Sequence, residues 1–186
     1  IRAIRLPELP EGYTIVDHHD IPGKNLVPIV YDDQPFLAVD EVNYIGQPIL
    51  LVVGADKKII LDIIEKIEVD YELLQPILSI EDAIKQSGSF IFGDKPYFVG
   101  YEYAKGNPDA AIAQAVRVIE DELRTVYQEH VYIEPQAMLG IYDGERVSVY
   151  GSMQCPYYIH SGLKQALGCG DDRVRVVQLP TDGGFG

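Results

Sequence analysis

The sequence predicts a mixed α/β (α+β) fold made of two successive parts. Short stretches of strand-like composition alternate with stretches of helical period, and a region rich in Gly, Pro and aromatic residues separates the two parts. Apolar residues make up 47% of the 186 positions, which is typical of a globular chain. This length suits one large hydrophobic core or two small ones.

The first part, residues 1–86, is predicted to be a compact α/β unit. Strands are expected at residues 1–6, 13–16, 36–39, 49–53 and 67–71, with an irregular loop at 26–35. The 49–53 strand is apolar on both faces, which predicts a central place in a sheet. Apolar residues follow a helical period over residues 56–66, where Asp56 is placed to cap the helix, and Ser79 opens a second, short helix.

Residues 87–108 are interpreted as an ordered connection, because their aromatic side chains need a surface to pack on. The second part, residues 109–186, has an ambiguous beginning. Residues 109–115 can open a helix, whereas the Val, Ile and Thr content of residues 116–126 favours a long strand. Residues 127–135 are expected to form a polar and aromatic loop.

The end of the second part carries stronger local signals. Asp143-Gly144 predicts a hairpin turn between strands at residues 136–142 and 146–150. Pro156 suits the first turn of a helix over residues 156–167, and Gly168 is placed to end it. Residues 174–179 form the last expected strand, which leads into a glycine-rich loop.

Charge and composition exclude several classes of function. The formal net charge of −14 repels nucleic acid and anionic lipid, and no apolar run is long enough to cross a bilayer. Cys155 and Cys169 are the only cysteines, too few for an Fe–S cluster or a disulfide framework. We therefore expect a cytoplasmic chain whose partners are neither nucleic acid nor membrane.

Two loops that follow predicted strands, residues 151–156 and 181–186, are the candidate ligand site. Strand ends are common ligand sites in α/β folds. The Gly-Gly-Phe-Gly run at 183–186 exposes peptide N–H groups to a phosphate or metal-oxo oxygen, although a simple tight turn is the commoner use of such a run. Gln154 offers a neutral donor, although an isolated loop Gln is more often solvated.

Other polar residues have structural explanations that are favoured. Adjacent side chains on a strand face opposite ways, so residues 17–20 (Asp-His-His-Asp) are expected to be an exposed strand end rather than a metal site. Residues 128–130 and Glu134 are expected to form a buried, hydrogen-bonded brace rather than an acid–base pair. Cys155 is expected to be a packed thiol, and residues 120–122 a solvated acidic face.

A family resemblance adds what spacing cannot. Residues 40–53 (Asp-Glu-Val-Asn-Tyr-Ile-Gly-Gln-Pro-Ile-Leu-Leu-Val-Val), then 67–72 and 74–76, resemble the hammerhead domain of the xanthine dehydrogenase and aldehyde oxidase family of molybdenum hydroxylases. Gln-Glu-His-Val-Tyr-Ile-Glu-Pro at 128–135, Ser-Met-Gln at 152–154 and the closing glycine loop resemble the start of that family's molybdopterin-binding domain. The matches keep their order over most of residues 37–186.

The resemblance implies a reaction and a set of partners. The family hydroxylates an electron-poor carbon of a purine, another N-heteroaromatic ring or an aldehyde, with water as the oxygen source. It uses molybdenum–molybdopterin, with the cytosine dinucleotide form as one option, and Fe–S and FAD centres that are expected on other domains or subunits. A non-catalytic scaffold module that kept the hammerhead fold is the alternative.

The resemblance also implies residue roles. Gln154 matches the glutamine whose amide hydrogen-bonds a terminal molybdenum ligand, and Phe185 matches the phenylalanine that orients the substrate. Gly184 and Gly186 match backbone positions near the pterin and metal ligands. Asp182 departs from the family, which usually has glycine there, and would place a carboxylate beside the cofactor loop or force it outward.

No catalytic residue is expected within the chain, because the family's catalytic glutamate lies beyond Gly186. The chain begins at Ile1 without Met and stops inside the glycine loop, so we expect an inactive fragment that needs the remainder of the molybdopterin domain.

Overall fold

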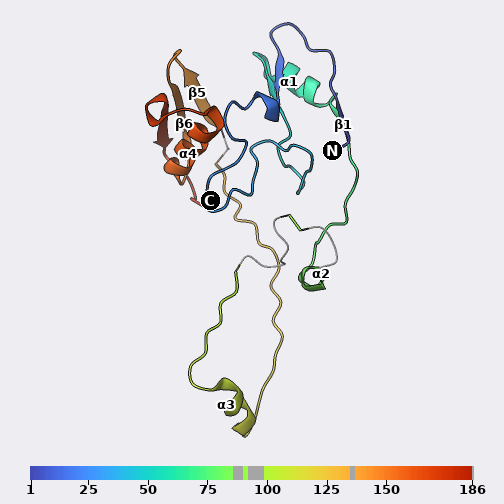
Figure 1. The fold of residues 1–186 in the computed structure, drawn as a ribbon, viewed down its shortest axis with the longest axis vertical. Coiled ribbons are helices and arrows are strands. Elements are labelled where there is room, and N and C mark those ends of the chain that lie inside the picture. The colour runs from blue at the N-terminus through green and yellow to red at the C-terminus, as the bar shows by residue number, and fades with distance from the viewer. Residues whose placement is uncertain (86–89, 92–98, 135–136, 186) are drawn as a thin grey trace. The chain divides into compact units, whose positions relative to one another are not determined.

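The chain separates into two units, shown as a ribbon in Figure 1. The computed structural model describes residues 1–85, 90–91, 99–134 and 137–185. The first unit combines residues 1–74 with residues 132–186, and the second holds residues 75–131. The division into domains at 1–86 and 109–186 with a connection at 87–108 stays a prediction.

Most predicted elements of the first unit are present. Its N-terminal part contains β1 (Ala3–Arg5), β2 (Thr14–Val16), the 3-10 turn η1 (His18–Asp20), β3 (Leu51–Val53), α1 (Lys57–Ile64) and β4 (Glu68–Asp70). Its C-terminal part contains β5 (Met138–Tyr142), β6 (Val147–Ser152), α4 (Pro156–Leu167), the 3-10 turn η2 (Asp171–Arg173) and β7 (Val174–Leu179).

The N-terminal strands pair in twos. β1 is antiparallel to β4, with Ile4 opposite Val69, and β2 is antiparallel to β3, with Ile15 opposite Val52. The prediction that the 49–53 strand is central in a sheet was wrong. Among the residues that the structure describes, β3 pairs with β2 alone, and its two end residues are exposed. Two apolar faces can also belong to a strand at the edge of a small core. Asp56 caps α1 as predicted, accepting from the Lys58 N–H at 2.7 Å.

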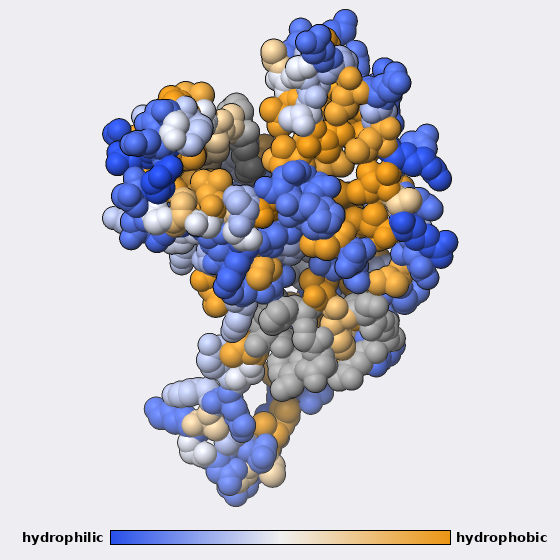
Figure 2. Space-filling view, turned by 45° about the horizontal axis from the view of Figure 1, so that its top comes forward, coloured by the Kyte–Doolittle hydropathy of each residue, from blue (hydrophilic) through white to orange (hydrophobic). Residues whose placement is uncertain are grey.

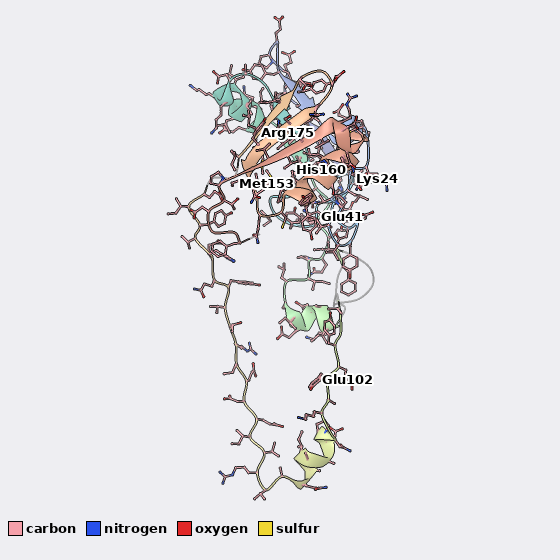
Figure 3. All side chains as sticks on the ribbon, turned by 90° about the vertical axis from the view of Figure 1, so that its left-hand side faces the viewer. Lys24, Glu41, Glu102, Met153, His160 and Arg175 are labelled. Carbon is pink, nitrogen blue, oxygen red and sulfur yellow. The ribbon has the colours of Figure 1, made fainter. Side chains whose placement is uncertain are left out.

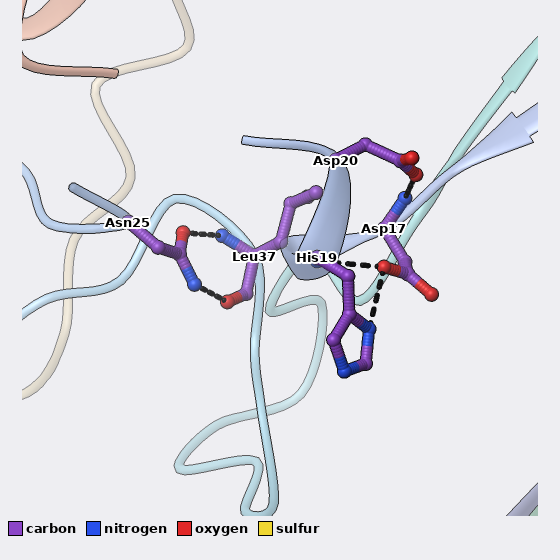
Figure 4. Close-up of polar contacts among 5 residues, drawn as sticks. All are labelled: Asp17, His19, Asp20, Asn25 and Leu37. Carbon is purple, nitrogen blue, oxygen red and sulfur yellow. Dashed lines mark hydrogen bonds and ion pairs between the residues drawn. The ribbon is translucent and has the colours of Figure 1, made fainter. Parts of the chain in front are cut away.

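The strand predicted at residues 36–39 is absent, although Leu37 and Ala38 are buried there at 4% and 1% exposure. The Asn25 side chain takes the place of a strand partner. Its Nδ2 donates to the Leu37 carbonyl at 2.6 Å, and its Oδ1 accepts from the Leu37 N–H at 2.9 Å (Figure 4). The N–H and carbonyl groups of a buried residue can therefore be hydrogen-bonded by one amide side chain instead of by a neighbouring strand.

The C-terminal part is a three-stranded sheet in the order β5-β6-β7. β5 and β6 form the predicted antiparallel hairpin, and β7 lies parallel to β6, with Val149 opposite Val176. α4 makes the crossover between the parallel strands, and Gly168 ends it in a left-handed conformation with φ of 63°. Val149, Met153 and Val174 are buried in this part.

The turn that precedes Asn25 docks on the carboxyl end of α4. The Gly23 N–H donates to the Ala166 carbonyl at 2.8 Å, and the Lys24 N–H donates to the Gln165 carbonyl at 2.9 Å. The Gln165 side chain returns a bond to the Leu26 carbonyl at 2.7 Å. These contacts satisfy the helix-end carbonyls and join the two sequence-distant parts of the first unit.

The second unit contains two short helices, α2 (Ile80–Lys85) and α3 (Pro108–Gln114). Ser79 caps α2 as predicted, accepting from the Asp82 N–H at 3.0 Å. The strand favoured over residues 116–126 is absent: residues 115–131 are in no helix or strand, and Figure 1 shows them as a single extended trace. A strand needs a hydrogen-bonding partner, and the described residues provide none for this segment. The acidic residues 120–122 are exposed, as expected.

Apolar side chains also reach the surface, as the orange areas of Figure 2 show. In the first unit they include Leu51, Val53, Leu61 and Ile64, which are each about half exposed. Within the described residues no helix combines the length and apolar character needed to cross a membrane.

We predict that Gly23→Ala destabilises the protein by about 3 kcal/mol. A Cβ at Gly23 would lie 2.0 Å from the Gln165 carbonyl oxygen and 2.7 Å from the Gly168 nitrogen, and backbone atoms cannot rotate away. Gly140→Ala is the matched control, because a Cβ at that strand position meets nothing within 4 Å. The free energy of unfolding from urea titration measures both. Equal values for the two variants would show that the turn does not depend on this contact.

The hairpin turn predicts a pH dependence. Hydrogen bonds from the Arg146 N–H and then the Glu145 N–H lower the pKa of Asp143. A lowered folded-state pKa gives stability that is full above the unfolded value of about 3.9 and is lost as the pH falls through the folded value. Asp143→Asn keeps an acceptor but cannot titrate, so acid unfolding of this variant should lack that step. A carbon-13 NMR titration of Asp143 that gave an unshifted or raised pKa would contradict the prediction.

Candidate functional site

The two candidate loops lie side by side because they follow parallel strands. β6 and β7 run in the same direction with Ser152 opposite Leu179, so residues 153–155 and 180–185 leave the same edge of the sheet. Ligands of α/β sheets commonly bind at this carboxyl edge. Figure 3 labels Met153 at the end of β6 and His160 on the following helix.

Hydrogen bonds tie the two loops together. The Met153 N–H donates to Thr181 Oγ1 at 3.2 Å, and Gln178 Nε2 donates to the Met153 carbonyl at 2.7 Å. Met153 itself is buried at 6% exposure, which anchors its loop in the core. The Met138 side chain packs over Gly151, where a Cβ would lie 2.0 Å from Met138 Sδ. Gln154 follows Met153 directly, so the hydrogen bonds at Met153 also fix the backbone that carries Gln154.

Gln154 is exposed, and its side chain reaches the glycine loop. A Cβ built on Gly184 would lie 4.0 Å from Gln154 Oε1, which places the amide group beside the peptide of Gly184. Gly184 has φ of 67°, a conformation that favours glycine. The structure therefore brings together the amide and the bare peptide that the sequence singled out.

Phe185 lies in the same loop as Gly184, and its ring packs against Tyr132, which precedes β5. Its ring centroid is 6.5 Å from that of Tyr132, and 58% of the residue is exposed. Gly183 has φ of 78°, and a Cβ there would lie 2.7 Å from the Phe185 ring. The ring thus covers Gly183 because that residue has no side chain. Gly186, the fourth predicted site residue, lies outside the described residues.

Asp182, which departs from the family pattern, is held through its backbone. Its N–H donates to Glu134 Oε2 at 3.3 Å, and its carbonyl accepts from the Gly184 N–H at 3.0 Å. Residue Asp182 is exposed, and Glu134 is half-buried. One carboxylate from the 128–135 segment therefore supports the glycine loop, while Pro135 of that segment is outside the described residues.

Two sequence predictions about neighbouring residues were wrong. Gln128, Glu129 and His130 are exposed, not a buried brace, and Glu129 Oε1 accepts from the adjacent His130 N–H at 2.9 Å. Cys155 is exposed at the start of α4 rather than packed. Both errors arise because a polar–aromatic composition or a small thiol does not specify burial without its packing partners.

Among the residues that hold the two loops together, the sequence singled out Glu134, as part of a hydrogen-bonded brace, and Thr181, in the candidate loop, but not Gln178. Thr181, Gln178 and Glu134 each hydrogen-bond the backbone of one of the two loops. The signal available for Gln178 was its position close to the end of the strand before the glycine loop. No local pattern connects Glu134 to Asp182, which is 48 residues away.

A family model described as the molybdopterin cofactor-binding domain matches residues 91–186, more than half of the chain. The chain belongs to the molybdenum hydroxylase family. The predicted family is thus confirmed, as is the mixed α/β fold class.

Two curated relatives illustrate the similarity. It is 33% identical over 173 residues to the "Nicotinate dehydrogenase large molybdopterin subunit" of Eubacterium barkeri, covering 92% of this chain and 41% of the relative. It is 34% identical over 187 residues to a xanthine dehydrogenase of Emericella nidulans, covering 96% of this chain and 13% of the relative. The chain therefore spans less than half the length of either relative.

A solved structure supports the fold of this chain. The aldehyde oxidoreductase from Desulfovibrio gigas aligns with a TM-score of 0.78 at 23% identity, covering 95% of this chain and 21% of that one. At this identity the likeness establishes the fold alone.

We predict that Thr181→Val loosens the two loops, residues 153–155 and 180–185. The change removes the hydroxyl that accepts from the Met153 N–H, at a net cost of about 1 kcal/mol. Amide hydrogen exchange at Met153 should then be about five- to tenfold faster. Thr181→Ser keeps the hydroxyl and is the matched control. An unchanged exchange rate in Thr181→Val would show that β6 and β7 alone position the loops.

Proposed function

We propose that the chain forms part of the molybdenum cofactor site of a hydroxylase that acts on an electron-poor carbon of a purine, another N-heteroaromatic ring or an aldehyde, with water as the oxygen source. The observation that supports it is the placement of the Gln154 amide beside the Gly184 peptide at the carboxyl edge of parallel strands. The family match to residues 91–186 supplies the cofactor class.

The residues at this edge fit an anionic, oxygen-bearing group. Gly184 presents its peptide without a side chain, at φ of 67°, so a ligand can approach its backbone closely, whereas the Phe185 ring lies over Gly183. Gln154 adds a neutral amide, which can donate to an oxo or sulfido ligand that a carboxylate would repel. The Glu134 carboxylate nearby is engaged by the Asp182 N–H.

Each residue has a proposed role. Gln154 donates its amide hydrogen to a terminal ligand of the metal, and Gly184 and Gly186 bring their peptides close to the cofactor. Phe185, with 58% of its surface exposed, offers an apolar edge that orients a planar substrate. When bound, the molybdenum cofactor accepts the electrons that the substrate loses.

The remaining components lie outside this chain in the proposal. Fe–S and FAD centres on other domains or subunits carry the electrons onward, and the rest of the molybdopterin domain supplies the catalytic base. The cytosine dinucleotide form of the cofactor is one option. The 186-residue chain by itself is expected to be inactive, and the intact protein to be cytoplasmic.

We predict that Gln154→Ala in the intact protein lowers kcat about 10²-fold while the molybdenum content per chain stays unchanged, because it removes a donor to the reacting centre and no core group. Gln154→Glu should lower kcat at least as much, since a carboxylate cannot donate. Gln34→Ala is the control, because Gln34 is also exposed but lies in the N-terminal part.

Dye-coupled turnover of a panel of N-heteroaromatic and aldehyde substrates measures the effect, with molybdenum determined by mass spectrometry. Normal turnover in Gln154→Ala would exclude the assigned role. Absence of both molybdenum and pterin from the intact wild-type protein would instead favour the non-catalytic scaffold.

A further inference from the structure

Three metal-ligating side chains that the proposed function does not use gather at the start of η1. Asp17, His18 and His19 each offer one ligand atom, and these atoms all lie within 4.8 Å of one another. The two imidazole rings are 3.9 Å apart between centroids, with 35° between their planes. Asp17 Oδ1 lies 2.9 Å from His19 Nδ1 (Figure 4).

The backbone that carries these side chains is fixed by reciprocal capping. Asp17 Oδ1 accepts from the His19 N–H at 2.7 Å, and Asp20 Oδ2 accepts from the Asp17 N–H at 2.8 Å. A capping box satisfies two end donors of the turn at once. The turn is thus already ordered, so a ligand that bound here would not have to order it.

This turn corrects the sequence-based argument against a metal site. Residues 17–20 were expected at the end of a strand, where the side chains of adjacent residues point to opposite faces. In the structure β2 ends at Val16, and a 3-10 turn follows in which the Asp17 side chain folds back onto His19. Consecutive residues can therefore direct their ligand atoms to one place.

We propose that Asp17, His18 and His19 form a surface site for a divalent cation of the class that prefers imidazole, namely zinc, nickel or copper(II). Two imidazole nitrogens and one carboxylate oxygen suit these ions, and three protein ligands leave a position for water. None of these three residues belongs to the loops at residues 153–155 and 181–185.

The distances require only a small adjustment. Ligand atoms bound to one tetrahedral zinc at about 2.1 Å lie about 3.4 Å apart. The side chains of His19 and Asp17 are 77% and 44% exposed, so side-chain rotation can close the gap without moving the backbone. Asp17 Oδ2 takes no part in the cap, which leaves this oxygen available to the ion.

Charge favours a cation at this position. Asp17 contributes one carboxylate to the cluster. Asp20 adds a second carboxylate in the same turn, and the chain as a whole has a net charge of −14. A divalent cation would therefore reduce local repulsion as well as gain three ligands.

The test is zinc binding to the intact protein, followed by competition with a chromophoric chelator. The wild type should bind one more zinc per chain than the double variant His18→Asn/His19→Asn. The single variant His19→Asn should weaken that binding at least about tenfold. His160→Asn is the matched control, because it removes an imidazole from α4, and its zinc binding should stay within about twofold of wild type.

The variant Asp17→Asn distinguishes the two roles of the Asp17 side chain, as a metal ligand and as the N-cap of η1. Asn is as good an N-cap as Asp, so this variant should keep the turn, as judged by an unchanged melting temperature, and still bind zinc about tenfold more weakly. Equal zinc stoichiometry and affinity in the wild type and the His18→Asn/His19→Asn variant would overturn the proposal. Full affinity in Asp17→Asn would overturn the three-ligand site, because the carboxylate would then take no part.

Discussion

The first unit depends on the docking of one turn onto one helix end. The peptide N–H groups of Gly23 and Lys24 bind the last carbonyls of α4, and Gln165 binds back to Leu26. α4 is also the crossover that makes β6 and β7 parallel, so the helix links the N-terminal part to the sheet whose edge carries the candidate site. The absence of a side chain at Gly23 is what permits this approach.

The features that sequence predicted well are those whose cause is local. α4 begins at Pro156 and ends before Gly168 as predicted, and β7 occupies the predicted residues, because a capping or breaking residue acts on its own neighbours. The hairpin around Asp143-Gly144 is correct for the same reason. Strands at residues 36–39 and 116–126 were wrong, because strand formation requires a partner that composition cannot identify.

The site shows the same division between local and distant information. Gln154 and the glycine loop were identified by resemblance, but their convergence follows from the parallel pairing of β6 and β7, which no local pattern specifies. The turn at residues 17–20 is the opposite case, because assigning it to a strand hid a cluster that a 3-10 turn creates. Expecting a strand end where the chain forms a 3-10 turn therefore led to the prediction that residues 17–20 bind no metal.

Asp182 illustrates how a departure from a family pattern can be accommodated. Glycine is required in this loop where φ is positive or where a side chain would collide, and both conditions hold at Gly183. Neither is found at Asp182, whose N–H binds Glu134 and whose carbonyl accepts from Gly184. Both contacts use the main chain, so neither depends on which side chain stands at this position. The backbone requirement therefore falls on the two glycines that follow, Gly183 and Gly184, where the sequence keeps glycine.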